Sequence, residues 1–306
     1  MLITLVADAP VAELGPLPPE AHLALVAPGE PIPPDTEFLV LEPAFRERLT
    51  ENVPAALKVV QTVHAGVDWV PQLPGGVTLC NASGVHDGPV TEWIIGVILA
   101  MGKRLPHYWD SQRAGVWDHG GNLSFGDGPA PMYLGESTVL IVGYGSIGAL
   151  LETHLALFGC RVLRIARHAR DGVHGPDELP CLLGEADVVV LLAPATAETR
   201  GLVDEEFLEG MRPGALLVNA ARGTLVDTRA LLKALHAGHI RAALDATDPE
   251  PLPDGHPLWS APGVFVTPHV AGSSASWRER AYRLAGEQIR AHTAGRPLRN
   301  VRRHGY

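Results

Sequence analysis

Short apolar runs recur at regular intervals along the second half of this 306-residue chain. They are rich in Val, Leu, Ile and Ala, and successive runs start about 25 residues apart, which is the length of one βα unit. We expect strands over residues 137–143, 160–166, 187–193, 214–220, 241–246 and 263–268. Strands that are apolar along their whole length are typical of a parallel sheet covered on both faces. The pattern therefore predicts a doubly wound parallel α/β sheet of the Rossmann type.

A second, smaller set of apolar runs precedes these strands. They predict strands of another α/β unit over residues 3–7, 23–27, 38–41, 57–63 and 77–80. A helical pattern from about residue 90 to 103 would link the two units, and a last helix begins after Ser276, its expected N-cap. That last helix would cross back to the first unit. We therefore expect a dinucleotide-binding domain over residues 98–277, inserted into a smaller, flavodoxin-like substrate domain formed by residues 1–97 and 278–306.

The stretch over residues 118–137 separates the two halves of this pattern. It is rich in Gly, Pro and Ser and predicts a long loop. A loop of this length within a compact domain is usually functional or an assembly arm. The sequence leaves its role open.

Composition and charge exclude several classes of partner. Hydrophobic residues make up 46% of the chain and charged residues 19%, as in a globular protein with sizeable cores. The net charge of −10 argues against nucleic acid and against an anionic membrane as the main partner. The longest apolar run, residues 93–101, is far shorter than the roughly 20 residues of a membrane span. A small molecule is therefore the expected partner.

The cysteines and the first residues indicate a compartment. Cys80, Cys160 and Cys181 are an odd number without C-x-x-C spacing, so we expect neither a disulfide framework nor a metal site. The residues after Met1 lack a basic segment and a cleavage site, and they predict a first strand rather than a signal peptide. A cytoplasmic location is the expectation.

A glycine-rich turn follows the first strand of the Rossmann-type sheet. The sequence GYGSIG, from Gly143 to Gly148, fits the pattern G-x-G-x-x-G between an apolar strand and a helix. In dinucleotide-binding sheets the first glycine makes a tight turn, the second (Gly145) admits the pyrophosphate, and the third lets the helix pack on the strand. The free N–H groups at the helix N-terminus favour phosphates. Because the pattern also arises by chance, the flanking strand and helix carry the prediction of a dinucleotide.

The end of the next strand bears on the choice between NAD and NADP. In NAD-binding sheets an Asp or Glu there holds the ribose hydroxyls. This chain has Ala166 instead, followed by Arg167, His168 and Arg170. A guanidinium at this place pairs well with a 2′-phosphate, which favours NADP. Solvated surface charges after a strand are the alternative interpretation.

Three further side chains follow strands of the same sheet. Arg222, Glu250 and His269 each come shortly after a predicted strand, so they should converge on the edge that carries the glycine turn. The set fits hydride transfer to a 2-oxo acid. His269 would donate the proton that the carbonyl oxygen needs, and Glu250 would favour the imidazolium. Arg222 would hold the substrate carboxylate. Each residue also has a structural alternative: His269 could cap a turn, Glu250 could be a solvated loop residue, and Arg222 could form an ion pair at a helix end.

Several short motifs are distributed in a specific order along nearly the whole chain. They are HAGVD at residues 64–68, the glycine turn, LAP at 192–194, ET at 198–199, NAARG at 219–223, LDATDPEP at 244–251 and TPH at 267–269. Together they resemble the D-isomer specific 2-hydroxyacid dehydrogenases, which include glyoxylate and hydroxypyruvate reductases and phosphoglycerate dehydrogenase.

The resemblance implies an activity and further site residues. It implies an NAD(P)-dependent homodimeric oxidoreductase that acts on a small 2-oxo or 2-hydroxy acid and uses the arginine, glutamate and histidine above as its catalytic set. The residues that it places against the cofactor are Ser146, Ile147, Ala193, Pro194, Ala221 and Asp245. It puts Asp245 near the nicotinamide amide. The backbone around Ala65 and Gly66 would cradle the substrate carboxylate.

Departures from the family pattern narrow the function and leave rivals. Ala166 with Arg167 looks like the members that use NADPH, often glyoxylate or hydroxypyruvate reductases. An NAD-dependent phosphoglycerate-type dehydrogenase remains an alternative, while Glu250 disfavours formate dehydrogenase, which carries Gln there. A non-catalytic corepressor that senses the cofactor has the same fold and is the alternative from another class. In this family, side chains at the positions of His86 and Trp117 can approach the active site, although a packing role is an equal expectation for each.

Overall fold

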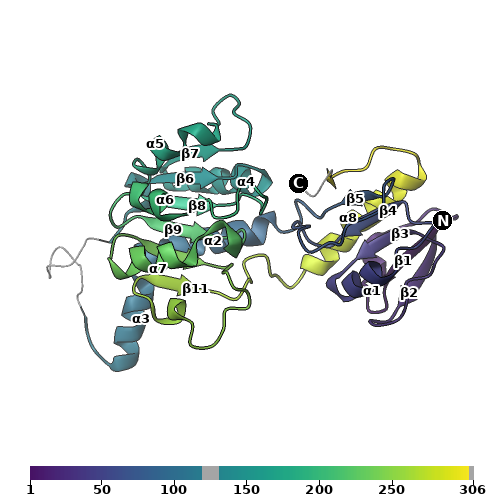
Figure 1. The fold of residues 1–306 in the computed structure, drawn as a ribbon, viewed down its shortest axis with the longest axis horizontal. Coiled ribbons are helices and arrows are strands. Elements are labelled where there is room, and N and C mark those ends of the chain that lie inside the picture. The colour runs from purple at the N-terminus through teal and green to yellow at the C-terminus, as the bar shows by residue number, and fades with distance from the viewer. Residues whose placement is uncertain (119–130, 303–306) are drawn as a thin grey trace. The chain divides into compact units, whose positions relative to one another are not determined.

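The chain folds into two compact units, which Figure 1 colours along the sequence. Unit 1 comprises Met1–Asp87 and Ser273–Tyr306, and unit 2 comprises Gly88–Gly272. The computed structural model describes residues 1–118 and 131–302. Most of the long loop predicted from residue 118 onward therefore lies outside the described residues.

The boundaries between the units differ from the expected positions. We expect a boundary after residue 97, in the middle of α2 (Asp87–Gly102), whereas the division falls just before Gly88. Ile94 and Ile98 of α2 are buried in the same apolar cluster as strands of unit 2, so the helix packs with that unit along its length. The second boundary lies after residue 272 rather than residue 277.

Unit 1 contains a six-stranded sheet in the order β12-β5-β4-β3-β1-β2. Its strands are β1 (Leu2–Val6), β2 (His22–Val26), β3 (Thr36–Leu41), β4 (Val59–Thr62), β5 (Thr78–Cys80) and β12 (Val301–Arg302). The strands predicted from the apolar runs are parallel, and β12 adds an antiparallel edge on β5. The sequence does not predict β12 because a two-residue strand carries no period.

Helices flank this sheet. They are η1 (Val11–Leu14), η2 (Pro43–Phe45), α1 (Arg46–Glu51) and α8 (Trp277–Thr293). Tyr282 and Ile289 of α8 share an apolar cluster with Ile3 and Phe38, so the last helix packs on β1 and β3 of unit 1. Its packing against η1 is close, because a Cβ on Gly286 would lie 1.9 Å from the carbonyl oxygen of Leu14. The last helix therefore returns to the first unit.

The start of α8 differs in one detail from the prediction. Ser276 occupies the N-cap position, but its side chain makes no capping hydrogen bond. Its hydroxyl oxygen instead accepts from Arg280 at 2.7 Å. A side-chain partner one turn along the helix has replaced the backbone N–H that an N-cap serine usually binds.

Unit 2 contains a six-stranded sheet in the order β11-β10-β9-β8-β6-β7, and all of its pairings are parallel. Its strands are β6 (Thr138–Val142), β7 (Arg161–Ile165), β8 (Val188–Leu191), β9 (Leu216–Asn219), β10 (Arg241–Leu244) and β11 (Val264–Val266). The doubly wound sheet predicted from the apolar runs is confirmed. The carboxyl ends of the six strands form one edge.

Helices cover both faces of this sheet. The longer ones are α2, α3 (Leu105–Ala114), α4 (Ser146–Leu155), α5 (Leu179–Leu183), α6 (Glu205–Gly210) and α7 (Thr228–His236). Single turns occur at η3 (Leu134–Glu136), η4 (Ala156–Phe158), η5 (Pro176–Glu178), η6 (Gly223–Leu225) and η7 (Pro257–Ser260). Alternate residues of β6 enter two clusters: Leu140 and Val142 pack with α5 to α7, and Val139 and Ile141 with α2 and α4. Within the described residues, the helices are too short or too polar to cross a membrane.

Candidate active site

The glycine-rich turn joins β6 to α4, and its three glycines have different surroundings. Gly143 has φ +102°, and a Cβ there would lie 2.3 Å from the backbone nitrogen of Ala193. A Cβ on Gly148 would lie 3.2 Å from Ile141, so the helix sits close to the strand. A Cβ on Gly145 would meet nothing within 4 Å and would project into open space. The turn therefore leaves room for a ligand to approach its backbone at Gly145.

The start of α4 suits a phosphate. Gly145 is the N-cap residue and supplies no side chain to cap the helix, and the first turn contains no acidic residue. The N–H groups of Ser146 and Ile147 therefore lie in the first turn, where a helix has no internal acceptors. The other residues that the resemblance assigns to the cofactor follow β8 and β9 at the same edge of the sheet; these are Ala193, Pro194 and Ala221. The edge fits a dinucleotide.

A polar cluster lies beside this turn. The hydroxyl of Tyr144 donates to Glu152 at 2.5 Å, and Nε of Arg164 donates to the same carboxylate at 2.7 Å. The Arg164 guanidinium holds the pKa of Glu152 below its usual range. Nη2 of Arg170 donates to the carbonyl oxygen of Tyr144 at 2.9 Å, and its guanidinium lies 5.7 Å from the tyrosine ring centroid. No spacing rule predicts this cluster, because Tyr144 is a variable position of the motif.

The predicted 2′-phosphate site lies at the end of β7. Ala166 follows the strand and Arg167 is exposed beyond it. Nη2 of Arg167 lies 3.6 Å from Oε1 of Glu198, and both side chains are 66% exposed. Solvent screens such a pair, so it contributes little to stability and leaves the guanidinium accessible. Arg170, three residues further along the chain, is a cation that the structure holds against the backbone of the glycine turn.

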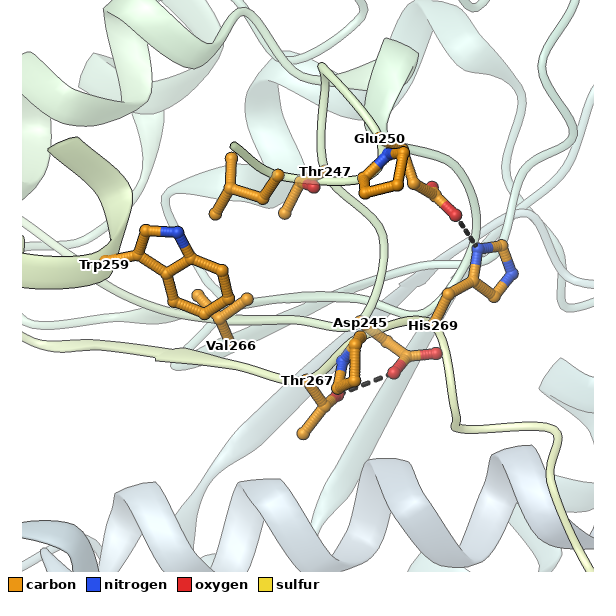
Figure 2. Close-up of a pocket in the computed structure, with 10 residues that line it drawn as sticks. Asp245, Thr247, Glu250, Trp259, Val266, Thr267 and His269 are labelled. Carbon is orange, nitrogen blue, oxygen red and sulfur yellow. Dashed lines mark hydrogen bonds and ion pairs between the residues drawn. The ribbon is translucent and has the colours of Figure 1, made fainter. Parts of the chain in front are cut away.

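The histidine and the glutamate predicted for catalysis meet at the edge of the same sheet. Nδ1 of His269 lies 2.6 Å from Oε1 of Glu250, at hydrogen-bond distance, and Figure 2 shows the two side chains pointing toward each other. Both are more than 40% exposed, at 44% and 42%. They border a pocket of about 260 Å³ whose other side is formed by Trp259 and Val266. A histidine whose Nδ1–H is bound by a carboxylate presents Nε2 to a substrate and is suited to general acid catalysis.

Arg222 lies in a turn that its neighbours define. The amide of Asn219 donates to the carbonyl oxygen of Arg222 at 2.9 Å and its oxygen accepts from the N–H of Ala221 at 3.1 Å. A Cβ on Gly223 would lie 1.9 Å from the carbonyl oxygen of Thr247, so this turn packs directly on the segment that follows β10. The backbone of Arg222 is therefore held just after β9, and Glu250 follows the neighbouring strand, β10.

Asp245 directly follows β10 and is only 4% exposed. Its carboxylate accepts from the hydroxyl of Thr267 at 2.6 Å and from the N–H groups of Val270 and Ala271, both at 2.8 Å. These partners all belong to the segment around His269. The structure thus adds bonds within the chain to the cofactor role that the resemblance implies for Asp245.

In unit 1, the segment with Ala65 and Gly66 follows β4. The carbonyl oxygen of Ala65 accepts from the amide of Asn81, and that of Gly66 accepts from the indole N–H of Trp69 at 2.9 Å. By contrast, the N–H groups of Ala65 and Gly66 have no acceptor among the described residues. Because the carbonyl oxygens of Ala65 and Gly66 are already hydrogen-bonded while their N–H groups have no acceptor in the described part of the chain, this backbone is suited to bind an anion.

A family model for the NAD binding domain of D-isomer specific 2-hydroxyacid dehydrogenases matches residues 95–271. That span is more than half of the chain and includes the glycine turn, the His269–Glu250 pair and Arg222. The chain belongs to this family. The predicted class of enzyme, an NAD(P)-dependent D-2-hydroxyacid dehydrogenase, is thereby confirmed.

Known dehydrogenases resemble the chain in sequence and in structure. A glyoxylate reductase of Thermofilum pendens is 36% identical over 78% of this chain and 73% of its own length. A D-isomer specific 2-hydroxyacid dehydrogenase of Xanthobacter autotrophicus, solved with NADPH, has a TM-score of 0.83 and 29% identity, and the match covers 100% of both chains. An NADPH-dependent glyoxylate/hydroxypyruvate reductase of Sinorhizobium meliloti, solved with NADP, has a TM-score of 0.82 and 26% identity over 100% of this chain and 99% of its own.

Two further residues of this dehydrogenase were expected near the site. The ring of His86 in unit 1 stacks on that of His64 with centroids 5.7 Å apart, and the His64 ring stacks on Trp277 at 5.3 Å. Trp117 in unit 2 is 87% exposed. His86 therefore packs in a ring cluster, while Trp117 contributes its ring to the surface. Among the described residues, no group of three His, Cys, Asp or Glu side chains is arranged to hold a metal ion.

Proposed function

We propose that this dehydrogenase reduces small 2-oxo acids of the glyoxylate and hydroxypyruvate type and that it prefers NADPH. The observation that carries the proposal is the 2.6 Å contact between His269 and Glu250 at the sheet edge that also bears the glycine turn. An imidazole oriented by a carboxylate can deliver a proton where a carbonyl is being reduced. That combination of a dinucleotide turn and a proton donor is what 2-oxo acid reduction requires.

The three catalytic residues have separate tasks in this proposal. His269 donates the proton that the carbonyl oxygen takes up, and it removes the hydroxyl proton in the reverse direction. Glu250 fixes the ring through Nδ1 and compensates the positive charge of the imidazolium. Arg222 binds the substrate carboxylate through its planar guanidinium, which orients the carbonyl group.

The cofactor is held by the edge of unit 2. When bound, the nicotinamide supplies or accepts the hydride. The first turn of α4 holds the pyrophosphate by its N–H groups, and Gly145 leaves the space that the phosphates need. Arg167 and Arg170 bind the 2′-phosphate, since both guanidinium groups follow β7, where NAD-type sheets carry an acid. Two dehydrogenases that are similar to this chain were solved with NADPH or NADP, which supports the same preference.

The N–H groups of Ala65 and Gly66 in unit 1 bind the substrate carboxylate in this proposal. Their open donors support that role, because two successive backbone N–H groups form a concavity that suits an anion. The arrangement limits the substrate only at its acid group.

A substrate panel tests the proposal. Purified protein is incubated with NADPH or NADH and with glyoxylate, hydroxypyruvate, pyruvate or 2-oxoglutarate, and the loss of reduced nicotinamide is followed. We expect turnover of glyoxylate and hydroxypyruvate, with kcat/KM higher for NADPH than for NADH. No turnover with any 2-oxo acid would refute the enzymatic role and favour a cofactor-sensing binding protein. Turnover with NADH alone would refute the cofactor preference.

We further propose that the protein is a cytoplasmic homodimer. Helix α3 has no buried residue, and Leu105 and Trp109 on it are 53% and 59% exposed. Val116 and Trp117 just beyond it are also exposed, at 58% and 87%. An apolar surface of this kind favours a protein interface, and a second copy is the occupant that we propose. Trp109→Ser would shift the mass measured by light scattering from dimer toward monomer; an unchanged mass would exclude this surface.

The free thiols support the cytoplasmic part of the proposal, because free cysteines are typical of a reducing compartment.

A further inference from the structure

The carboxylate of Asp245 bridges the two sides of the His269 residue. Its Oδ1 accepts from Thr267, two residues before the histidine, and from Val270, directly after it. Its Oδ2 accepts from the N–H of Ala271. Three donors from one five-residue segment thus converge on a single buried carboxylate, and Figure 2 shows Asp245 beneath the histidine on the pocket wall.

The backbone at His269 is in an unusual conformation that needs such support. Its φ is +53°, in the left-handed region, where a residue with a Cβ is disfavoured by roughly 1–2 kcal/mol. The N–H of His269 donates to the carbonyl oxygen of Asp245 at 2.8 Å. Asp245 therefore holds the histidine by its main chain and holds the residues on either side by its side chain. Without these bonds, nothing in the local sequence favours φ > 0 at this position.

We propose that Asp245 is a positioning residue, which fixes the left-handed turn at His269 and thereby aims the imidazole at Glu250. The inference rests on the proposed function, since it assigns His269 the proton transfer. It also differs from the role against the nicotinamide that the family resemblance implies. An ionised carboxylate offers about four acceptor sites, of which the chain itself occupies three.

Loss of the charge has a definite consequence in this arrangement. In Asp245→Asn the amide NH₂ must replace one oxygen, so it faces either Ala271 N–H or the donors from Thr267 and Val270. Two donors then face each other and one buried N–H loses its acceptor. The turn at His269 relaxes toward φ < 0, which displaces the imidazole from Glu250. Since a displacement of about 1 Å can cost a factor of 10², we expect kcat to fall by about 10-fold to 100-fold.

A double-mutant cycle separates positioning from cofactor binding. Asp245→Asn, Glu250→Gln and the double variant are compared for kcat, and the Kd of NADPH is measured by protein fluorescence. If Asp245 acts through the His269–Glu250 pair, the double variant loses much less than the product of the two single losses, and the Kd stays within about twofold. A multiplicative loss in kcat, or a Kd raised tenfold or more in Asp245→Asn, would overturn the positioning role.

A matched control and a second measurement make the test independent of turnover. Asp227→Asn alters a carboxylate that also accepts two backbone N–H groups, at the start of α7, and should leave kcat unchanged. NMR of ¹³C-labelled histidine in the free protein, with His269→Ala for assignment, then reports on the ring directly. We expect the His269 signal to shift in Asp245→Asn and not in Asp227→Asn. An unmoved signal would refute the inference, whereas an inactive wild type with the shift would refute only the proposed substrate.

Discussion

The guanidinium of Arg170 is bound to the backbone of Tyr144, the residue between the first two glycines of the turn. Nη2 donates to the tyrosine carbonyl oxygen at 2.9 Å, and the N–H of Arg170 donates to Val173, which closes a tight turn behind it. Glu152 fixes the tyrosine ring by accepting from its hydroxyl. A cation after β7 is therefore held in place before any ligand binds, which lowers the entropy cost of binding a phosphate.

Arg170→Ala should therefore weaken NADPH binding more than NADH binding. A charge-assisted hydrogen bond contributes about 1.5–3 kcal/mol, so we expect the Kd of NADPH to rise by about tenfold or more and that of NADH to stay within about twofold. Arg167→Ala should act in the same direction but less, because the Arg167 side chain is 66% exposed and solvent screens its charge. Fluorescence titration with both dinucleotides provides the measurement. Equal effects on the two cofactors would disprove the 2′-phosphate role.

The open space at Gly145 predicts that a methyl group there obstructs the cofactor and not the fold. Gly145→Ala places the new group where no protein atom lies within 4 Å. We expect the Kd for either dinucleotide to rise by about tenfold, which corresponds to 1.4 kcal/mol. The melting temperature of the free protein should change little, because φ at this residue is −109°.

Gly143→Ala is the matched control for that substitution. Its φ of +102° and the 2.3 Å approach to Ala193 require the chain to shift, so this variant should lose about 1–3 kcal/mol of folding stability. Thermal unfolding with and without NADPH distinguishes the two variants. If Gly145→Ala binds the cofactor like the wild type, the phosphates do not pass over this residue.

The parallel strands of both sheets were predictable because apolar runs at βα spacing leave few alternatives, and the order of the motifs along the chain identified the candidate catalytic residues. The contacts that orient those residues could not be predicted from the sequence. Nothing in the spacing shows that Asp245 accepts from Val270, since that bond depends on the left-handed conformation of His269, three residues after β11. Arg170 reaches the glycine turn only because the chain doubles back at Val173. Such contacts depend on loop geometry, which has no periodic signature.

His269→Ala should abolish most of the catalytic rate. Loss of a general acid costs roughly 10² to 10⁴ in kcat, and binding of NADPH should be unaffected because His269 holds no part of the dinucleotide in this proposal. Glu250→Gln should lower kcat by about tenfold. The substitution removes the negative charge beside His269, and solvent screens this charge because both side chains are more than 40% exposed. Steady-state kinetics with the best acid of the panel measures both. An undiminished kcat in His269→Ala would exclude it as the proton donor.

The pair formed by Tyr282 and Glu42 in unit 1 gives a prediction about stability and pH. The Tyr282 hydroxyl donates to Oε1 of Glu42 at 2.6 Å, and the tyrosine is fully buried. Burial first, and then the neighbouring carboxylate, raise the pKa of Tyr282 far above its usual value. Tyr282→Phe should lower the free energy of unfolding by about 1.5–3 kcal/mol at neutral pH, because a bond to a charged acceptor is lost.

The sign of the pH effect follows from the direction of that shift. Because folding raises the pKa, the contribution of Tyr282 is fully present below pH 10.0, the ordinary value for tyrosine, and is lost as the pH rises above it. The unfolded chain then ionises at this residue while the folded chain does not, so the advantage of the wild type over Tyr282→Phe shrinks by about 1.4 kcal/mol per pH unit. Urea unfolding of both proteins between pH 8 and 11.5 measures the difference. A difference that stays constant above pH 10 would show that the folded-state hydroxyl is not protected from ionisation.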